Sequence, residues 1–331
     1  MTDPEVTNVS TGEPGESGTR PHQRPSRADI EARAHDLEAQ VRATNDKINA
    51  RTGRPILLAI LVGVGLGAAL LVSLLIVKEL FTIFALALII VASLELATAL
   101  RVSGRDVPRI AVIIGAVLVV PASFWALDPS RGLSNEAGHW LATLVAVALV
   151  VAWRLAEQLA PSRRTAAPAL VRDLGAGAYI VLYTIFLPSF FVLLVAQDNG
   201  QWWALAALII VVSVDTGAYA SGLAFGKNKM VPSISPNKTW EGFAGSVAAA
   251  VIAGVLLALL MLQQPWWVGV IMGLTIVLTA TVGDLTESLI KRDLGVKDIS
   301  TWLPGHGGLL DRLDSALPSA AAAYALFIVF T

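Results

Sequence analysis

The sequence predicts an all-α, polytopic integral membrane protein with about nine transmembrane helices and a polar N-terminal tail. Hydrophobic residues make up 55% of the 331 residues and charged residues only 15%, whereas soluble domains carry roughly 25% charged residues. The apolar residues form long runs, each near the roughly 20 residues that an α-helix needs to cross a bilayer. These runs lie at approximately 56–77, 80–100, 109–127, 138–154, 174–196, 202–222, 240–262, 266–290 and 314–330. Such a surface requires a non-aqueous environment.

The N-terminal part of the chain differs from the rest. Residues 1–26 are rich in Pro, Gly, Ser, Thr and Glu, which is typical of a disordered tail. In residues 27–53, apolar side chains such as Ile30 and Leu37 share one helical stripe between charged residues, which predicts a short amphipathic juxtamembrane helix. The stripe is thin, so a solvated helix and a coiled-coil partner site both stay open. Residues 54–331 are the predicted transmembrane domain.

The distribution of basic residues predicts the orientation in the membrane. Cytoplasmic loops of membrane proteins collect Lys and Arg. With the N-terminus inside, all but two of the 24 basic residues, Lys78 and Arg131, fall in the tail or in cytoplasmic loops. We therefore expect an N-in/C-out topology in the cell (inner) membrane, with the loops after the sixth and eighth spans at the cytoplasmic face.

Charge and cysteine content limit the partners. A formal net charge of -1 gives no general attraction to nucleic acid, and 0 Cys excludes disulfides and thiolate zinc sites. Membrane lipids are the expected surroundings. Gly63, Gly65 and Gly67 would permit close helix packing, and whether this packing occurs within one chain or in a homodimer is open.

Three carboxylates lie within the predicted spans, where charge is costly. For Glu95, structural pairing, interfacial solvation and a site role are all open, and for Asp215 both a structural hydrogen bond and a function are open. Asp284, Ser288 and Lys291 are spaced i, i+4, i+7, so they lie on one helix face. This carboxylate, hydroxyl and ammonium series suits a metal ion followed by a phosphate. The alternative is a helix end whose basic residues face lipid headgroups.

A glycine-rich segment follows the eighth predicted span. Residues 303–308 read Leu-Pro-Gly-His-Gly-Gly, and glycines leave backbone N–H groups free to approach an anion. Asp311 and Asp314, spaced i, i+3, place two carboxylates on one face of the following helix. Hard oxygen ligands suit a Mg²⁺ ion that also binds substrate phosphates. The alternative is an ordinary connection with solvated charges.

The loop after the sixth predicted span is also unusual. Ser235 before Pro236 predicts an N-cap and first turn of a helix, which would aim free amides and Lys238 at a phosphate. The pair Gly226 and Lys227 lacks the surrounding P-loop pattern. A nucleotide would therefore be held without a P-loop.

The stretch from Ser288 to Ser315 resembles the signature of the phosphatidate cytidylyltransferase (CDP-diacylglycerol synthase) family. It fits SxxKRxxxxKD followed by PxHGGxxDRxD, and the segments ISPNKTWEG and DTGAYxxGxxFGK resemble the two other recurrent segments of that family. The resemblance covers about residues 55–331. It implies an enzyme that converts phosphatidic acid and CTP to CDP-diacylglycerol and pyrophosphate, with the site at the cytoplasmic ends of spans six to nine.

The resemblance also implies roles for individual residues. We expect Asp284 and Asp311, supported by Asp314, to hold Mg²⁺, and a second cation is left open. Lys238 completes the expected catalytic set. The further residues expected to bind substrate phosphates are Lys291, Arg292, Lys297, Arg312, His306, Ser235, Asn237, Thr239 and Ser288.

Two positions depart from the family pattern. Family members commonly have Lys where this chain has Asn237, and Arg where it has Leu223. Each change removes a positive charge from the expected phosphate-binding region, so the contribution of that loop is an open question.

Two other functions are alternatives. A membrane CTP-dependent lipid kinase, of the dolichol or phytol kinase kind, would transfer the γ-phosphate to an alcohol and release CDP. A transporter would use Glu95 and Asp215 to line a pathway, but this does not explain why glycine, acidic and basic residues concentrate at one face. The family signature favours the nucleotidyltransferase.

Overall fold

The computed structural model describes residues 56–125, 134–296, 299–300 and 307–331. These residues belong to one unit of the chain, Pro55–Thr331. The predicted tail (1–26) and the predicted amphipathic helix (27–53) lie outside the described residues.

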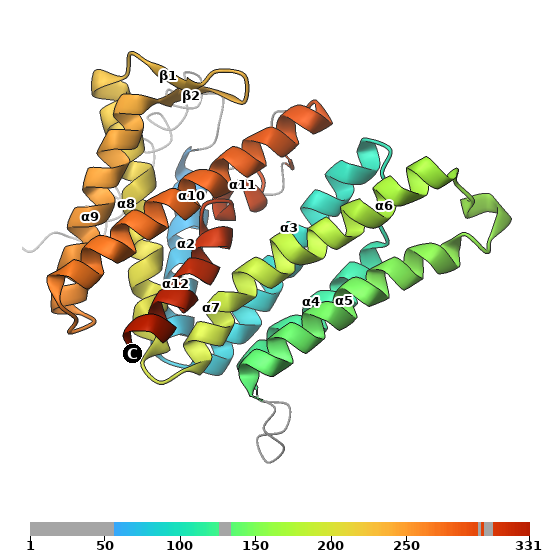
Figure 1. The fold of residues 1–331 in the computed structure, drawn as a ribbon, viewed down its shortest axis with the longest axis horizontal. Helices are drawn as coiled ribbons and strands as arrows, with labels where there is room; N and C mark the ends of the chain where they lie inside the picture. Colours follow the sequence, from blue (N-terminus) through green and yellow to red (C-terminus); the bar gives the residue numbers. More distant parts are fainter. Residues whose placement is uncertain (1–55, 126–133, 297–298, 301–306) are drawn as a thin grey trace, which may run out of the picture. The chain divides into compact units, whose positions relative to one another are not determined.

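Each of the predicted apolar runs falls on a helix (Figure 1). The run at 174–196 is one continuous rod in which a π-helical segment, η3, joins α6 to α7. The elements are α2 (Ile56–Leu75), α3 (Lys78–Val102), α4 (Arg109–Phe124), α5 (Asn135–Glu157), η2 (Pro161–Arg163), α6 (Ala167–Ile180), η3 (Val181–Phe186), α7 (Leu187–Ala196), α8 (Gly200–Phe225), β1 (Lys229–Val231), β2 (Ser235–Thr239), α9 (Trp240–Leu260), α10 (Trp266–Leu294), α11 (Leu310–Leu313) and α12 (Ala316–Phe330).

Seven helical segments in the described part of the chain are long and apolar enough to cross a membrane. They are α3, α5, the α6 to α7 rod, α8, α9, α10 and the segment formed by α11 and α12. Two further apolar helices are shorter: α4 and the Leu61–Leu75 part of α2. The protein is thus a helical membrane protein, while the count of nine spans and the N-in/C-out orientation stay predictions.

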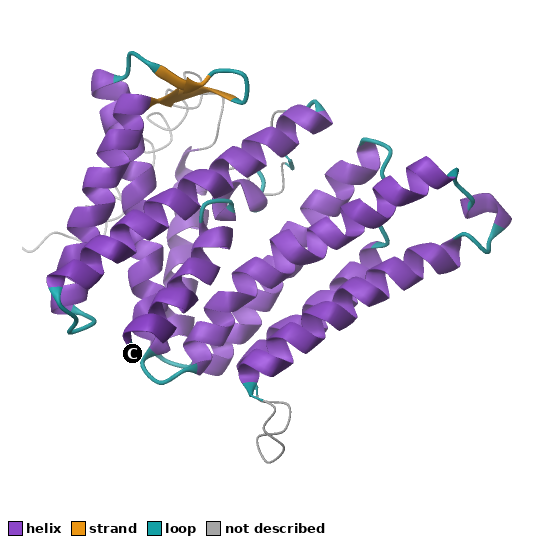
Figure 2. Ribbon diagram, viewed as in Figure 1, coloured by secondary structure: helices purple, strands orange, loops and turns teal. Residues whose placement is uncertain are grey.

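A two-stranded hairpin interrupts the helical architecture, orange in Figure 2. The expectation that a helix begins at Ser235 and Pro236 is wrong, because these residues belong to β2, which pairs with β1 in antiparallel register. A two-stranded ribbon tolerates a proline that cannot donate a hydrogen bond. The helix α9 begins at Trp240 instead, where the Thr239 hydroxyl accepts a hydrogen bond from the Gly242 N–H at 3.1 Å.

Small residues bring α8, α9 and α10 close together, with α9 packed against both neighbours (Figure 1). A Cβ atom at Gly217 of α8 would lie 2.8 Å from the Gly245 carbonyl oxygen of α9. Likewise, a Cβ atom at Gly254 of α9 would collide with the Gly269 carbonyl oxygen of α10. Membrane helices use such small residues because association depends on close van der Waals packing.

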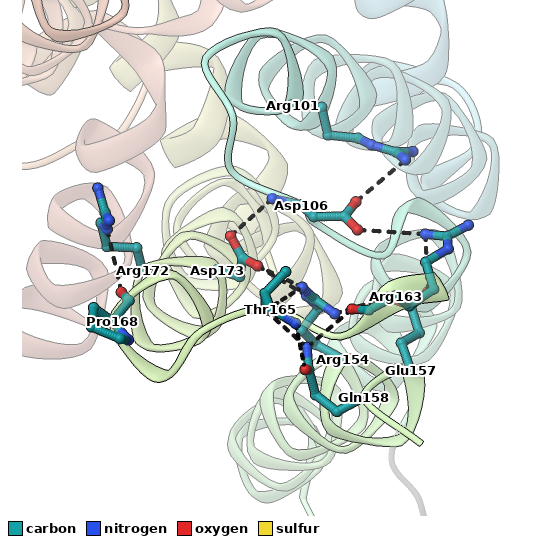
Figure 3. Close-up of polar contacts among 10 residues, drawn as sticks. All are labelled: Arg101, Asp106, Arg154, Glu157, Gln158, Arg163, Thr165, Pro168, Arg172 and Asp173. Carbon is teal, nitrogen blue, oxygen red and sulfur yellow. Dashed lines mark hydrogen bonds and ion pairs between the residues drawn. The ribbon is translucent and has the colours of Figure 1, made fainter. Parts of the chain in front are cut away.

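A buried ion pair fastens α5 to α6 (Figure 3). Arg154, only 1% exposed, donates from Nη2 to Asp173 Oδ2 at 2.7 Å and to the Thr165 hydroxyl at 3.2 Å. The second Asp173 oxygen accepts the Asp106 backbone N–H at 2.9 Å. These four residues are here called the Arg154 cluster. They connect the loop between α3 and α4 to the helices α5 and α6.

Candidate active site

One cavity of about 480 Å³ lies among α8, the hairpin, α9, α10 and the segment that begins at α11. Ten of the thirteen predicted site residues line this cavity. The fold therefore brings together residues that are separated by up to 79 positions in the chain. The ten residues are Ser235, Asn237, Lys238, Thr239, Asp284, Ser288, Lys291, Asp311, Arg312 and Asp314.

The helix α10 supplies one wall of the cavity. The predicted shared face of Asp284, Ser288 and Lys291 is confirmed, because all three lie on α10 and line the cavity. The Lys291 ammonium lies 2.6 Å from Glu287 Oε1 and 3.3 Å from Asp311 Oδ1. This ammonium therefore connects α10 to α11 across the cavity.

The hairpin supplies the facing side. Lys238 of β2 forms an ion pair with Asp284, with Nζ 2.6 Å from Oδ2, and the Ser288 hydroxyl donates to the other oxygen, Oδ1, at 3.4 Å. Farther along α10, Arg292 Nε donates to the Ile234 carbonyl oxygen at 3.1 Å. Two contacts thus fix the hairpin against α10, and each uses a residue expected to bind phosphate, Lys238 or Arg292.

The segment from Gly308 to Ser315 carries two of the carboxylates. Asp311 Oδ2 accepts the Gly308 backbone N–H at 3.3 Å, and Asp314 Oδ1 accepts the Ser315 N–H at 2.6 Å. A Cβ atom at Gly283 of α10 would collide with the Asp314 carbonyl oxygen. The absence of a side chain at Gly283 therefore lets this segment approach α10 closely enough to present both carboxylates to the cavity.

Two acidic residues join those predicted for the site. Glu287, which is only 2% exposed, was given no role in the site from the sequence, although its i, i+4 spacing to Lys291 was a usable signal. Asp215, whose role was left open, lines the cavity from α8. The lining thus carries five carboxylates against three cationic side chains, a formal excess of two negative charges. They are Asp215, Asp284, Glu287, Asp311 and Asp314 against Lys238, Lys291 and Arg312.

This donor set fits a hard divalent cation. The acidic lining offers oxygen ligands, which Mg²⁺ prefers, and a cavity with excess negative charge needs added positive charge before it can accept polyanions. Within the described ranges, no three acidic or histidine side chains converge closely enough to hold a metal ion as they stand. Instead, the ammonium groups of Lys238 and Lys291 lie against Asp284 and Asp311.

The remaining predicted residues lie elsewhere or outside the description. Arg292 does not line the cavity, and Lys297 and His306 lie outside the described residues. Of the two departures from the family pattern, Asn237 lines the cavity, whereas Leu223 is 77% exposed and does not. Phosphate contacts from Arg292, Lys297 and His306 stay predictions.

A helical membrane protein with a cavity rich in carboxylates and ammonium groups is the arrangement of a membrane-embedded transferase that handles phosphate compounds. Residues 57–330 match the family model described as "Cytidylyltransferase family". The chain belongs to this family and is a nucleotidyltransferase.

Relatives with assigned names cover most of the chain. The phosphatidate cytidylyltransferase of Mycobacterium bovis is 38% identical over 280 residues, which span 83% of this chain and 89% of that protein. The protein of the same name from Mycobacterium leprae is 38% identical over 288 residues, or 85% and 90% of the two chains. The Brucella suis protein of that name is 43% identical over 121 residues, which span 37% of this chain and 45% of that protein.

Proposed function

We propose that this chain transfers CMP from CTP to phosphatidic acid, giving CDP-diacylglycerol and pyrophosphate in a Mg²⁺-dependent reaction. The observation that carries the proposal is that ten predicted site residues line one and the same cavity. Relatives named phosphatidate cytidylyltransferase, which match more than four fifths of the chain, support the same substrates.

The proposed reaction joins two anions. A phosphate oxygen of phosphatidic acid attacks the α-phosphorus of CTP, a new P–O bond forms, and the bond from the α-phosphorus to the bridging oxygen breaks as pyrophosphate leaves. The nucleophile is already an anion, so no general base is required. The protein must hold the two phosphates in line and neutralise their charge.

The cationic side chains of the cavity suit this task. Lys238, Lys291 and Arg312 line it from three different elements. An ammonium group has three donors, so Lys238 can keep its contact with Asp284 while it donates to a phosphate oxygen. In this proposal the three cations bind and orient the two substrates.

Asp284 and Asp311, with Asp314, would hold Mg²⁺. The ion would supply charge neutralisation for the phosphate oxygens when bound. Asp215 and Glu287 leave further oxygen donors in the same lining for a second cation. Asp284 and Asp311 come from different elements, so both α10 and α11 must keep their places for an ion to be held.

The proposed location is the cytoplasmic face of the inner membrane. The positive-inside distribution of Lys and Arg supports an orientation that exposes the hairpin and the residues around α11 to the cytosol. The lipid phosphate would then meet CTP at headgroup depth.

The test uses the purified full chain in detergent, with phosphatidic acid, Mg²⁺ and CTP labelled on the α-phosphate. We expect the label to enter the lipid fraction and, in a parallel reaction, γ-label to appear as pyrophosphate. Transfer of γ-label to a lipid alcohol with release of CDP would instead identify a lipid kinase. Absence of both transfers would overturn the proposal.

A further inference from the structure

Glu95 is a buried carboxylate on α3 that does not line the cavity. Only 5% of this residue is exposed, and the next two residues of the helix, Leu96 and Ala97, are fully buried. A carboxylate in a membrane-spanning helix is costly unless its oxygens are satisfied. The hydrogen-bond donors to this carboxylate therefore indicate its role.

Among the described residues, three hydrogen bonds reach the Glu95 carboxylate, and their donors lie in one distant part of the chain. Oε1 accepts from the Ser300 hydroxyl at 2.6 Å and from the Leu309 backbone N–H at 3.0 Å. Oε2 accepts from the Leu310 N–H at 2.9 Å. A Cβ atom at Gly308 would lie 3.2 Å from Oε2, so the backbone there also passes close to the carboxylate.

One oxygen atom thus contacts both ends of the stretch from Ser300 to Leu309. The chain continues directly from Leu310 to Asp311 and Arg312, which line the cavity. The first helical N–H groups have no partner within their own helix, and here a carboxylate accepts two of them. Such charge-assisted bonds are stronger than neutral ones.

Asp311 lies in the first turn of a helical segment. α11 (Leu310–Leu313) continues through αR residues into α12, and the N–H groups at such a start have no acceptor within their own helix. The Lys291 ammonium contacts Asp311 from the cavity side, whereas Glu95 holds the backbone from the opposite helix, α3. The Asp311 side chain is thus contacted by Lys291 and by the Gly308 N–H, and the backbone just before it is held by Glu95.

We infer that Glu95 is a positioning residue that clasps the ends of the 300–309 stretch and thereby aims Asp311 and Arg312 into the cavity. Its catalytic consequence rests on the proposed function, but the clasp itself does not. Glu95 acts through the backbone that it binds and does not touch the substrates.

The first test measures turnover in Glu95→Gln and Glu95→Asp. The amide keeps the size of the side chain but replaces one acceptor with a donor, so we expect kcat to fall about 10- to 100-fold with a much smaller change in KM for CTP. Aspartate keeps the charge on a shorter side chain and should restore part of the loss. Glu79→Gln, an exposed position on the same helix, is the matched control and should leave both constants unchanged.

The second test measures amide hydrogen exchange at Leu309 and Leu310 in the same detergent-purified variants. Exchange should be slow in the parent chain, faster in Glu95→Gln, and unchanged in Glu79→Gln. This readout needs no substrate, so failure of the proposed reaction leaves it informative.

The two tests separate positioning from general stability. Wild-type kcat in folded Glu95→Gln would overturn the inference, as would a loss of activity that only parallels a lower melting temperature. Unchanged exchange at both amides would overturn the clasp itself. A fall in kcat with retained melting temperature and faster exchange would establish it.

Discussion

Two charged clusters of this molecule use the same residue types in opposite ways. In the Arg154 cluster, Arg154 and Asp173 are 1% and 3% exposed and face each other at 2.7 Å (Figure 3). In the candidate active site, five carboxylates face three cations around an open volume of about 480 Å³. Charge that is matched and desolvated holds helices together, whereas charge that is unmatched beside a cavity remains available for a ligand.

The largest expected effect on catalysis comes from removing a carboxylate from the cavity. Asp284→Asn and Asp311→Asn should each lower kcat about 10²- to 10³-fold, because each removes a charge proposed to hold Mg²⁺, while the melting temperature stays near that of the parent chain. Turnover is measured with saturating CTP and Mg²⁺. Asp198→Asn, an exposed carboxylate outside the cavity, is the control. Near wild-type turnover in either cavity variant would refute the proposed metal site.

Breaking the Arg154 cluster should instead lower the stability of the protein and leave catalysis unchanged. Asp173→Asn removes the closer charge partner of the buried Arg154 guanidinium and leaves only Glu157, at 3.7 Å from Nη1; breaking a buried pair typically costs about 3–5 kcal/mol. We expect a large loss of stability in detergent, measured by thermal unfolding, with unchanged kcat per folded molecule. Loss of kcat in fully folded protein would show that this cluster also serves the site. Asp293→Asn, whose side chain is 58% exposed, is the matched control and should cost far less.

Removal of Mg²⁺ should affect the candidate active site and leave the Arg154 cluster unchanged. A chelator should abolish activity and Mg²⁺ should restore it, because the acidic excess of the cavity otherwise repels CTP and phosphatidic acid. In the Arg154 cluster the Asp173 carboxylate is already paired with Arg154 and is not expected to bind the metal, so the melting temperature should change little. Full activity after dialysis against the chelator would contradict the prediction.

Lys238 tests the link between the hairpin and α10. Lys238→Gln removes the ion pair with Asp284 and one proposed phosphate contact, so we expect a loss of about 10- to 100-fold in kcat/KM. Lys229→Gln, an exposed lysine on the other strand, should have little effect. Equal losses in the two variants would mean that only the overall charge of the hairpin matters.

The smallest expected effect concerns the cap of α9. Thr239→Ala removes the acceptor for the Gly242 N–H and should cost about 1 kcal/mol of stability. Thr239→Ser keeps the oxygen and should restore stability. Activity that falls in the serine variant as well would point to a contact with substrate through the lost methyl group.

Local periodicity predicted much of this molecule. Apolar runs are repeated over many residues, so each predicted run falls on a helix. The i, i+4, i+7 face of Asp284, Ser288 and Lys291 was also accessible, because helical geometry alone determines which residues share a face. The hairpin was not predicted, since its strands have only three and five residues and a local Ser-Pro signal favoured a helix start.

Contacts between distant segments were beyond such reasoning. Nothing near Glu95 in the sequence indicates that its oxygens meet backbone amides more than 200 positions later. The pairing of Lys238 with Asp284 likewise depends on how the hairpin packs against α10. These contacts arise from tertiary packing, so a local sequence pattern cannot predict them.

The length of α10 determines where the chemistry takes place. Its 29 residues span about 43 Å, more than the roughly 30 Å of a hydrocarbon core, and Asp284 and Lys291 lie in its C-terminal half. A lipid bound at the C-terminal part of α10 could keep its acyl chains in the leaflet while only its headgroup reacts. Substrate would then arrive and product depart by lateral diffusion, so the rate should follow the mole fraction of the lipid in the surface rather than its concentration in the bulk volume.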